Sequence, residues 1–189
     1  MQAAGFVLVG GRSRRMGRDK ALLDWNSHTL VEDVAEKVRS VAGNVGLVGP
    51  VERYGALELQ CLPDIRPGMG PLAGIETAIE SGRGELNLIV ACDLPGLETA
   101  WLHGLLRRAE ETETSCVVLR DGRGDVQPLC GVYRRECLPS IRRALDEDRL
   151  RMLDVVAELK ASFFDIERPL ENLNTPEDVL AWQRAGDGG

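Results

Sequence analysis

A basic, glycine-rich stretch near the N-terminus is the part of the sequence best suited to bind a charged ligand. Gly10 and Gly11 follow an apolar run, and glycine lets the backbone turn tightly and approach a ligand because it has no Cβ. Five basic side chains come soon after: Arg12, Arg14, Arg15, Arg18 and Lys20. The whole chain has a net charge of −7, so a cationic loop here indicates a site for a polyanion such as a triphosphate.

This stretch matches neither of two familiar phosphate-binding motifs, and a basic loop is often no more than a solvated surface. A P-loop requires a glycine, four residues and then Gly-Lys-Ser/Thr, whereas five residues separate Gly11 from Gly17 and Arg18 follows. The dinucleotide fingerprint G-x-G-x-x-G is also absent, because Gly10 and Gly11 are adjacent. If the stretch binds phosphate, we expect it to use another geometry.

Two aspartates follow predicted strands, and each has a catalytic and a structural interpretation. Asp93 comes at the end of an apolar run, and Asp64 begins a loop dense in proline and glycine. A carboxylate in such a position can coordinate Mg²⁺ together with phosphate oxygens, or it can merely cap a turn. The basic stretch favours the ligand role. Asn172 and Asn174 could add neutral oxygens to a ligand or a metal, although Asn172 could also be a plain turn residue.

The other reactive side chains form no recognisable catalytic or metal-binding constellation. The chain has five cysteines, an odd number without a Cys-x-x-Cys pair. We therefore expect buried free thiols in a reducing cytoplasm rather than disulfides or a zinc site. His28 and His103 are isolated in the sequence, so we interpret both as surface or packing residues.

Length and composition indicate one domain, 1–189, of an ordinary globular protein, with a frayed end over the last few residues. A pI near 5.0 argues against a nucleic-acid partner. No apolar run approaches the ~20 residues of a membrane-spanning helix, and the N-terminus shows no secretory signal. We therefore expect a cytoplasmic protein without a membrane partner.

Hydrophobic patterns predict strands that alternate with helices. Short apolar runs predict strands at 6–9, 45–48, 57–62, 86–91, 115–119, 126–133 and 162–166, with a short strand or extended piece at 21–25. Apolar stripes and end signals predict helices at 30–42, 71–82, 101–109, 137–145 and 152–159, and a further helix start at Thr175. Pro128 places the start of its strand at an edge or a bulge.

This alternation predicts one three-layer α/β/α domain with a mostly parallel sheet, helices on both faces and right-handed crossovers. In such sheets, ligands bind outside the carboxyl ends of the strands. We therefore expect the loops 10–20, 64–71 and 93–95 to converge on one site.

Residues 8–20, LVGGRSRRMGRDK, closely resemble a signature usually written LAGGxSxRMGxDK, that of the molybdenum cofactor guanylyltransferases. This first block is shared with a wider nucleotidyltransferase superfamily, but further blocks follow in the family's order. They are Asp64 with GPLAGI at 70–75, ACDLP at 91–95, QPL at 127–129 and NLNTPED at 172–178. The blocks span positions 8–178 and therefore cover nearly the whole chain.

The resemblance implies a Rossmann-like nucleotidyltransferase fold and the transfer of GMP from Mg²⁺-bound GTP to molybdopterin, with release of pyrophosphate. By matching position, the backbone of the strand exit would contact the nucleotide at Leu8, Val9, Gly10 and Gly11. The catalytic residues would be Arg15, Lys20 and Asp93, of which Lys20 and Asp93 also bind the nucleotide and Asp93 holds Mg²⁺. Asp64 would contact the nucleotide, and Asn172 and Asn174 would lie on the molybdopterin or metal side. Other cofactor-biosynthesis proteins or recipient molybdoenzymes would be further partners.

Two departures from the family pattern keep alternatives open. Val9 replaces the alanine of the signature, which a backbone-contacting position should tolerate. The loop after the second strand reads GPVERY at 49–54 and lacks an asparagine that contacts the nucleotide in the family. Cytidylyl transfer to the same cofactor is therefore the nearest alternative. Transfer to a sugar phosphate and a non-catalytic nucleotide-binding module are the others. The blocks at 70–75 and 172–178 count against the first, and intact Arg15, Lys20 and Asp93 count against the second.

Overall fold

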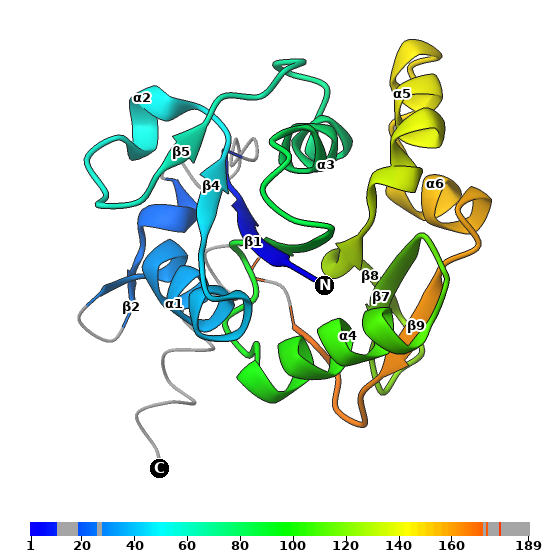
Figure 1. Cartoon of the computed structure of the whole chain (residues 1–189). Coiled ribbons are helices and arrows are strands. Elements are labelled where there is room, and N and C mark those ends of the chain that lie inside the picture. Colours follow the sequence, from blue (N-terminus) through cyan, green and yellow to red (C-terminus); the bar gives the residue numbers. More distant parts are fainter. Residues whose placement is uncertain (11–18, 26–27, 172, 174–177, 179–189) are drawn as a thin grey trace.

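A seven-stranded sheet forms the centre of the computed structural model, which describes residues 1–10, 19–25, 28–171, 173 and 178 (Figure 1). The strand order is β5-β4-β1-β6-β8-β7-β9. The strands are β1 (Ala3–Leu8), β4 (Gly46–Val48), β5 (Cys61–Leu62), β6 (Leu86–Ala91), β7 (Cys116–Arg120), β8 (Val126–Tyr133) and β9 (Ser162–Asp165). Neighbours run parallel except at β8, which is antiparallel to both β6 and β7. The prediction of a mostly parallel sheet is confirmed.

Helices cover both faces of this sheet, so the described chain has three layers (Figure 1). One face carries α1 (Leu30–Ala42) and α4 (Thr99–Glu111), and the other carries α3 (Pro71–Glu80), α5 (Leu138–Asp146) and α6 (Met152–Glu158). Side chains alternate along each strand, so that Val7 of β1 joins the core beneath α1 and Phe6 joins the core beneath α3. Every residue of β6 is buried, as expected for a central strand covered on both faces. The three-layer α/β fold is confirmed.

The ends of α1 and α3 follow the end signals in the sequence. The Glu32 carboxylate accepts hydrogen bonds from the backbone N–H and the hydroxyl of Thr29, at 2.8 and 2.6 Å, which fixes the start of α1. Gly43 ends that helix with a φ of 75°, in the left-handed region that favours glycine. Pro71 occupies the first turn of α3. Because α3 follows β5, which runs parallel to β4, its start lies at the carboxyl edge of the sheet.

The predicted strand at 57–62 is wrong over most of its length. Only Cys61–Leu62 form a strand, because the preceding chain folds into a short helix, α2 (Val51–Tyr54), and a turn. The N–H of Leu57 donates to the carbonyl of Tyr54 at 3.0 Å instead of joining the sheet. Leu57 and Leu59 nevertheless pack against the core, so their apolar character reflects packing in a turn rather than a strand.

Smaller differences occur at three other places. The piece at 21–25 becomes a 3₁₀ turn, η1 (Lys20–Leu22), followed by β2 (Asp24–Trp25), which pairs with β3 (His28–Thr29). The register of β7 against β8 shifts between Val118 and Leu119, opposite the segment that contains Pro128. The predicted bulge is therefore confirmed, although β8 lies inside the sheet. A further 3₁₀ turn, η2 (Arg135–Cys137), precedes α5.

The five cysteines are free thiols, and Cys116, Cys130 and Cys137 are buried, as expected. The helix start at Thr175 lies outside the described residues. Among the helices that are described, none has both the length and the apolar character needed to cross a membrane.

Candidate functional site

The exit of β1 is held between its two neighbouring strands. The N–H of Val9 donates to the carbonyl of Val48 at 2.9 Å, and the N–H of Cys92 donates to the carbonyl of Leu8 at 3.3 Å. Hydrogen bonding thus continues past the last residue of the strand on both sides. The backbone of Leu8 and Val9, to which the sequence assigns nucleotide contact, is therefore fixed in place at the carboxyl edge of the sheet.

Two glycines let the exits of β1 and β4 meet at van der Waals distance. Gly10 has a φ of 89°, and a Cβ at this position would lie 2.4 Å from Cδ of Pro50. Gly49 has a φ of 152°, and its Cβ would lie 2.5 Å from the carbonyl oxygen of Val9. Any larger residue at either place would push the two exits apart. The tight turn predicted for glycine at this strand exit is confirmed for Gly10.

Lys20, Asp93 and Leu173 meet at one junction. The Lys20 ammonium donates to the carbonyl of Leu173 at 2.6 Å, and the N–H of Leu173 donates to the carbonyl of Asp93 at 3.1 Å. The contact joins three segments of the chain, with 153 positions between Lys20 and Leu173. Leu173 is buried, so this residue is packed into the core at the junction.

The electrostatics of Asp93 suit a ligand for a divalent cation. Burial raises the pKa of its carboxyl group, and the ammonium of Lys20 opposes that rise. A desolvated carboxylate with little hydrogen bonding gains strongly from a hard cation such as Mg²⁺. Within the described part of the chain, no three His, Cys, Asp or Glu side chains gather into a complete metal site. The residues therefore fit Mg²⁺ that takes most of its ligands from phosphate oxygens and water.

Asp64 lies at the same edge of the sheet but is separate from that junction. It follows β5, which runs parallel to β4 and so ends on the same side as β1 and β6. Among described residues, its carboxylate makes no hydrogen bond or ion pair, with Lys20 and Asp93 or with any other partner. Burial raises the pKa of the Asp64 carboxyl group. The structure thus leaves this carboxylate available to a ligand.

Cys92 precedes Asp93 but does not offer a nucleophile. Burial, with the negative charges of Asp93 and Asp19, raises the pKa of its thiol well above the ordinary value. The thiol therefore stays protonated near neutral pH, and only the thiolate is strongly nucleophilic. This agrees with the sequence, in which no catalytic cysteine was expected.

Tyr54 is a site-supporting residue that the sequence analysis missed. Its hydroxyl donates to Oδ2 of Asp19 at 2.6 Å, and its side chain is completely buried. Asp19 in turn accepts from the N–H of Ala21 at 3.1 Å, which caps the 3₁₀ turn that carries Lys20. A buried tyrosine usually has a hydrogen-bond partner for its hydroxyl, but the sequence alone does not say which.

The remaining predicted site residues cannot be placed relative to this junction. They lie outside the described residues: Gly11, Arg15, Asn172 and Asn174, together with Arg12, Arg14 and Arg18.

Comparison with known proteins gives a consistent result. A family model described as the MobA-like NTP transferase domain matches residues 5–161. A probable molybdenum cofactor guanylyltransferase of Carboxydothermus hydrogenoformans is 35% identical, over 92% of this chain and 87% of that protein. The molybdenum cofactor guanylyltransferase of Pseudomonas entomophila is 34% identical, over 93% of this chain and 95% of that one.

A solved structure supports the fold. Molybdopterin-guanine dinucleotide biosynthesis protein A from Archaeoglobus fulgidus superposes with a TM-score of 0.84, covering 98% of this chain and 100% of that one. Its sequence identity to this chain is 22%, so the likeness concerns the arrangement of strands and helices.

Proposed function

The chain belongs to the MobA-like NTP transferase family, and on this premise we propose that it transfers GMP from Mg²⁺-bound GTP to molybdopterin. The observation that carries the proposal is the junction of Lys20, Leu173 and Asp93. It brings a cation, a partly desolvated carboxylate and the C-terminal segment together at the sheet edge where α/β folds bind ligands. The product would be the molybdopterin guanine dinucleotide, which a recipient molybdoenzyme or another cofactor-biosynthesis protein would take up.

The reaction joins two anions, so its barrier is largely electrostatic and positional. An oxygen of the molybdopterin phosphate forms a bond to the α-phosphorus of GTP, while the bond to the bridging oxygen of the β-phosphate breaks and pyrophosphate leaves. The ammonium of Lys20, held by the carbonyl of Leu173, would neutralise charge on the leaving phosphates. The fixed backbone of Leu8, Val9 and Gly10 would bind and orient the nucleotide beside it.

The carboxylate of Asp93 would hold the Mg²⁺ that accompanies the triphosphate. When bound, such an ion supplies charge stabilisation at the phosphate oxygens. Asp64 would add a second polar contact to the nucleotide, and Arg15 would add a second cation on the phosphates. No covalent intermediate on the protein is needed, which agrees with the protonated state of Cys92.

Cytidylyl transfer to the same cofactor is the second candidate, and one observation favours it. The segment 49–54 has no asparagine, and it folds into α2, whose Tyr54 supports Asp19. The nucleotide contact that the family's asparagine would make is therefore missing from this loop, which bears on the choice of base rather than on nucleotidyl transfer.

Pyrophosphate release with each nucleotide separates the two candidates. The protein is incubated with Mg²⁺, molybdopterin and either GTP or CTP, and pyrophosphate is measured over time. We expect release that requires molybdopterin and is at least roughly tenfold faster with GTP, a ratio typical of discrimination by a binding pocket. Faster release with CTP would refute guanylyl transfer, and release with a sugar 1-phosphate in place of molybdopterin would favour that acceptor class.

A further inference from the structure

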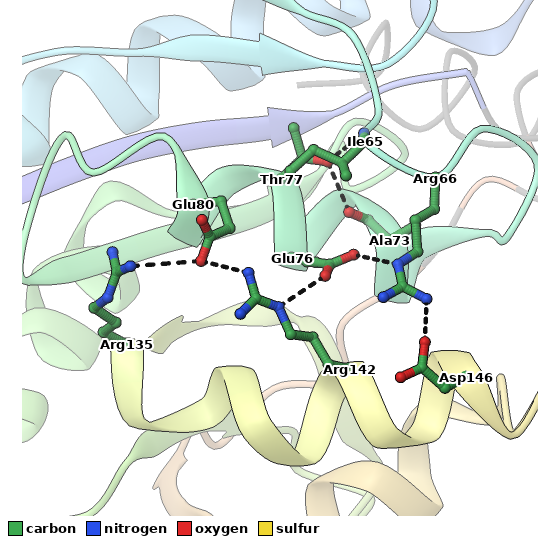
Figure 2. Close-up of polar contacts among 9 residues, drawn as sticks. All are labelled: Ile65, Arg66, Ala73, Glu76, Thr77, Glu80, Arg135, Arg142 and Asp146. Carbon is green, nitrogen blue, oxygen red and sulfur yellow. Dashed lines mark hydrogen bonds and ion pairs between the residues drawn. The ribbon is translucent and has the colours of Figure 1, made fainter.

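Two consecutive residues of α3 hold two consecutive residues of the loop that begins at Asp64. Thr77 contacts Ile65, and Glu76 contacts Arg66 (Figure 2). We call these four residues, Ile65, Arg66, Glu76 and Thr77, the loop anchor. The anchor acts on the chain immediately after the carboxylate that is assigned to the nucleotide.

Thr77 fixes the peptide group that links Asp64 to Ile65. Its Oγ1 accepts a hydrogen bond from the N–H of Ile65 at 3.0 Å and donates one to the carbonyl of Ala73 at 2.9 Å. Thr77 is only 5% exposed, so water does not replace either bond easily. Because that N–H belongs to the peptide directly after Asp64, its position restricts where the Asp64 side chain can point.

Glu76 fixes the next residue through a buried ion pair. Its carboxylate lies 3.0 Å from Nε of Arg66 and 3.1 Å from Nε of Arg142 on α5, and the residue is 2% exposed. An ionised carboxylate is buried to this degree only when it is paired, because removing it from water is otherwise very unfavourable. Glu76 therefore ties the loop to α5 as well as to α3.

An outer group of charges completes the network around the anchor (Figure 2). Asp146 of α5 pairs with Arg66 at 2.5 Å, and Glu80 pairs with Arg142 at 2.7 Å and with Arg135 at 3.6 Å. Three arginines thus balance three carboxylates. The ion pair between Glu80 and Arg135 belongs to the same network but includes no residue of the loop.

Among the described residues, the loop makes few other contacts, of which the packing of Met69 against the core beneath α3 is one. Its own backbone contributes a long hydrogen bond, from the N–H of Met69 to the carbonyl of Arg66 at 3.4 Å. Gly68 and Gly70 have φ values of 85° and 74°, so this part of the chain depends on glycine rather than on regular structure. As described above, the Asp64 carboxylate makes no hydrogen bond or ion pair with another described residue. A constrained backbone beside a free carboxylate is the arrangement expected of a pre-organised ligand contact.

We propose that Thr77 and Glu76 are positioning residues for nucleotide binding, which hold the Asp64 carboxylate where the nucleotide meets it. The inference rests on the proposed function, because it takes the nucleotide as the ligand of Asp64. Neither residue touches the substrate. Their effect passes through the backbone of Ile65 and the side chain of Arg66.

Thr77→Val is the sharpest test, because it keeps the shape of the side chain and removes the acceptor for the Ile65 N–H. We expect the Kd and the KM for Mg²⁺-bound GTP to rise about tenfold, as for the loss of one buried hydrogen bond, while kcat changes less than about twofold. Thr77→Ser restores the hydroxyl, and its KM should return to within about twofold of the wild-type value. Hydrogen exchange at the Ile65 amide should accelerate in the valine variant alone.

Ile79→Val is the matched control, since Ile79 is buried on the same helix, packs in the core and takes no part in the hydrogen bond or ion pairs of the loop anchor. It should lower the Tm about as much as Thr77→Val and leave the KM unchanged. Arg66→Gln provides a second variant if Thr77→Val fails to fold, because Arg66 is partly exposed, and its KM should also rise severalfold.

Two results would overturn the inference. One is an equal KM in Thr77→Val and Ile79→Val; the other is faster exchange at Ile65 with no change in GTP affinity. Either would show that the anchor serves the fold alone. Failure of the proposed function is read separately, from the absence of molybdopterin-dependent pyrophosphate release by the wild-type protein.

Discussion

Two segments are held at the carboxyl edge of the sheet by different means. The loop after Asp64 is held by side chains of α3 and α5, through one hydroxyl and a set of ion pairs. The described segment up to Leu173 is held by backbone hydrogen bonds, by the burial of Leu170 and Leu173, and by one carboxylate, that of Asp121 in the turn between β7 and β8. Asp121 accepts from the N–H groups of Arg123 and Asp125 in its own turn, at 2.9 and 3.0 Å, and from the N–H of Leu170 at 3.0 Å.

The two segments differ in how many side chains hold them. The charged network around Glu76 has several partly exposed members, so the loss of one leaves the others paired. Asp121 is 5% exposed and serves three backbone donors, each of which would lose its partner at once. We therefore expect the C-terminal segment to fail sharply and the Asp64 loop to weaken by degrees.

The largest effect should come from removing the carboxylate beside which the C-terminal segment docks. Asp93→Ala should lower molybdopterin-dependent turnover by about a thousandfold, the equivalent of several kcal/mol of lost charge stabilisation. The fold should persist, because the backbone carbonyl of Asp93, which binds Leu173, remains. Turnover is compared with the wild type at saturating GTP, and an unchanged rate would make Asp93 a turn residue.

Asp121→Ala should remove the hydrogen bond that connects the turn between β7 and β8 to Leu170. The buried N–H of Leu170 and the partly buried N–H groups of Arg123 and Asp125 would lose their acceptor, so the free energy of unfolding should fall by about 2–4 kcal/mol, measured by urea denaturation. Turnover should fall too, because the nearby carbonyl of Leu173 holds the Lys20 ammonium. Asp125→Ala is the control in the same turn, where only the backbone of Asp125 takes part; an equal loss in both variants would contradict this account.

Glu76→Gln should have a smaller effect on stability. It removes the charge that faces Arg66 and Arg142, and because both arginines are partly exposed the loss should be about 2 kcal/mol, below the roughly 3–5 of a fully buried pair. Glu36→Gln is the control, since its pair with Arg39 is exposed and should contribute less than about 0.5 kcal/mol. Chemical denaturation of both variants compares the two pairs directly.

The stabilisation that the Asp121 carboxylate provides should decrease modestly at acid pH. Burial of Asp121 would raise its pKa, but the three backbone N–H groups outweigh burial and lower the pKa below the ordinary value. A lowered folded-state pKa means that the stabilisation is complete above the unfolded-state pKa of about 3.9 and is lost as the pH falls through the folded-state value. The difference in unfolding free energy between wild type and Asp121→Asn should therefore be constant near neutrality and shrink below about pH 4. A constant difference down to pH 2 would rule out the charge as its source.

The sequence predicted the central elements well, because their signals are local. The apolar run of β6 and the end signals of α1 and α3 identify those elements without knowledge of the fold. The strand at 57–62 failed because alternating leucines in a turn imitate a strand, and α2 is too short to show a helical period.

For the site too, residues with local signals were predicted and long-range contacts were not. Asp93 was identified by residue type and neighbourhood, and the family resemblance singled out Lys20 from five basic residues; the structure joins the two. The means of joining could not be predicted, because it runs through the backbone of Leu173, and every residue type except proline offers the same N–H and carbonyl. Tyr54, Thr77 and Asp121 were missed for a related reason, since their partners are backbone groups or distant side chains that leave no mark in the sequence.

The fate of the α-phosphate tests the central claim most directly. The protein is supplied with Mg²⁺, molybdopterin and GTP labelled with ³²P at the α-phosphate, in parallel with GTP labelled at the γ-phosphate. We predict that the α-label appears in the pterin product and the γ-label in pyrophosphate, in equal amounts. An α-label found only in free GMP or unreacted GTP, or transfer from labelled CTP but not from GTP, would contradict the account.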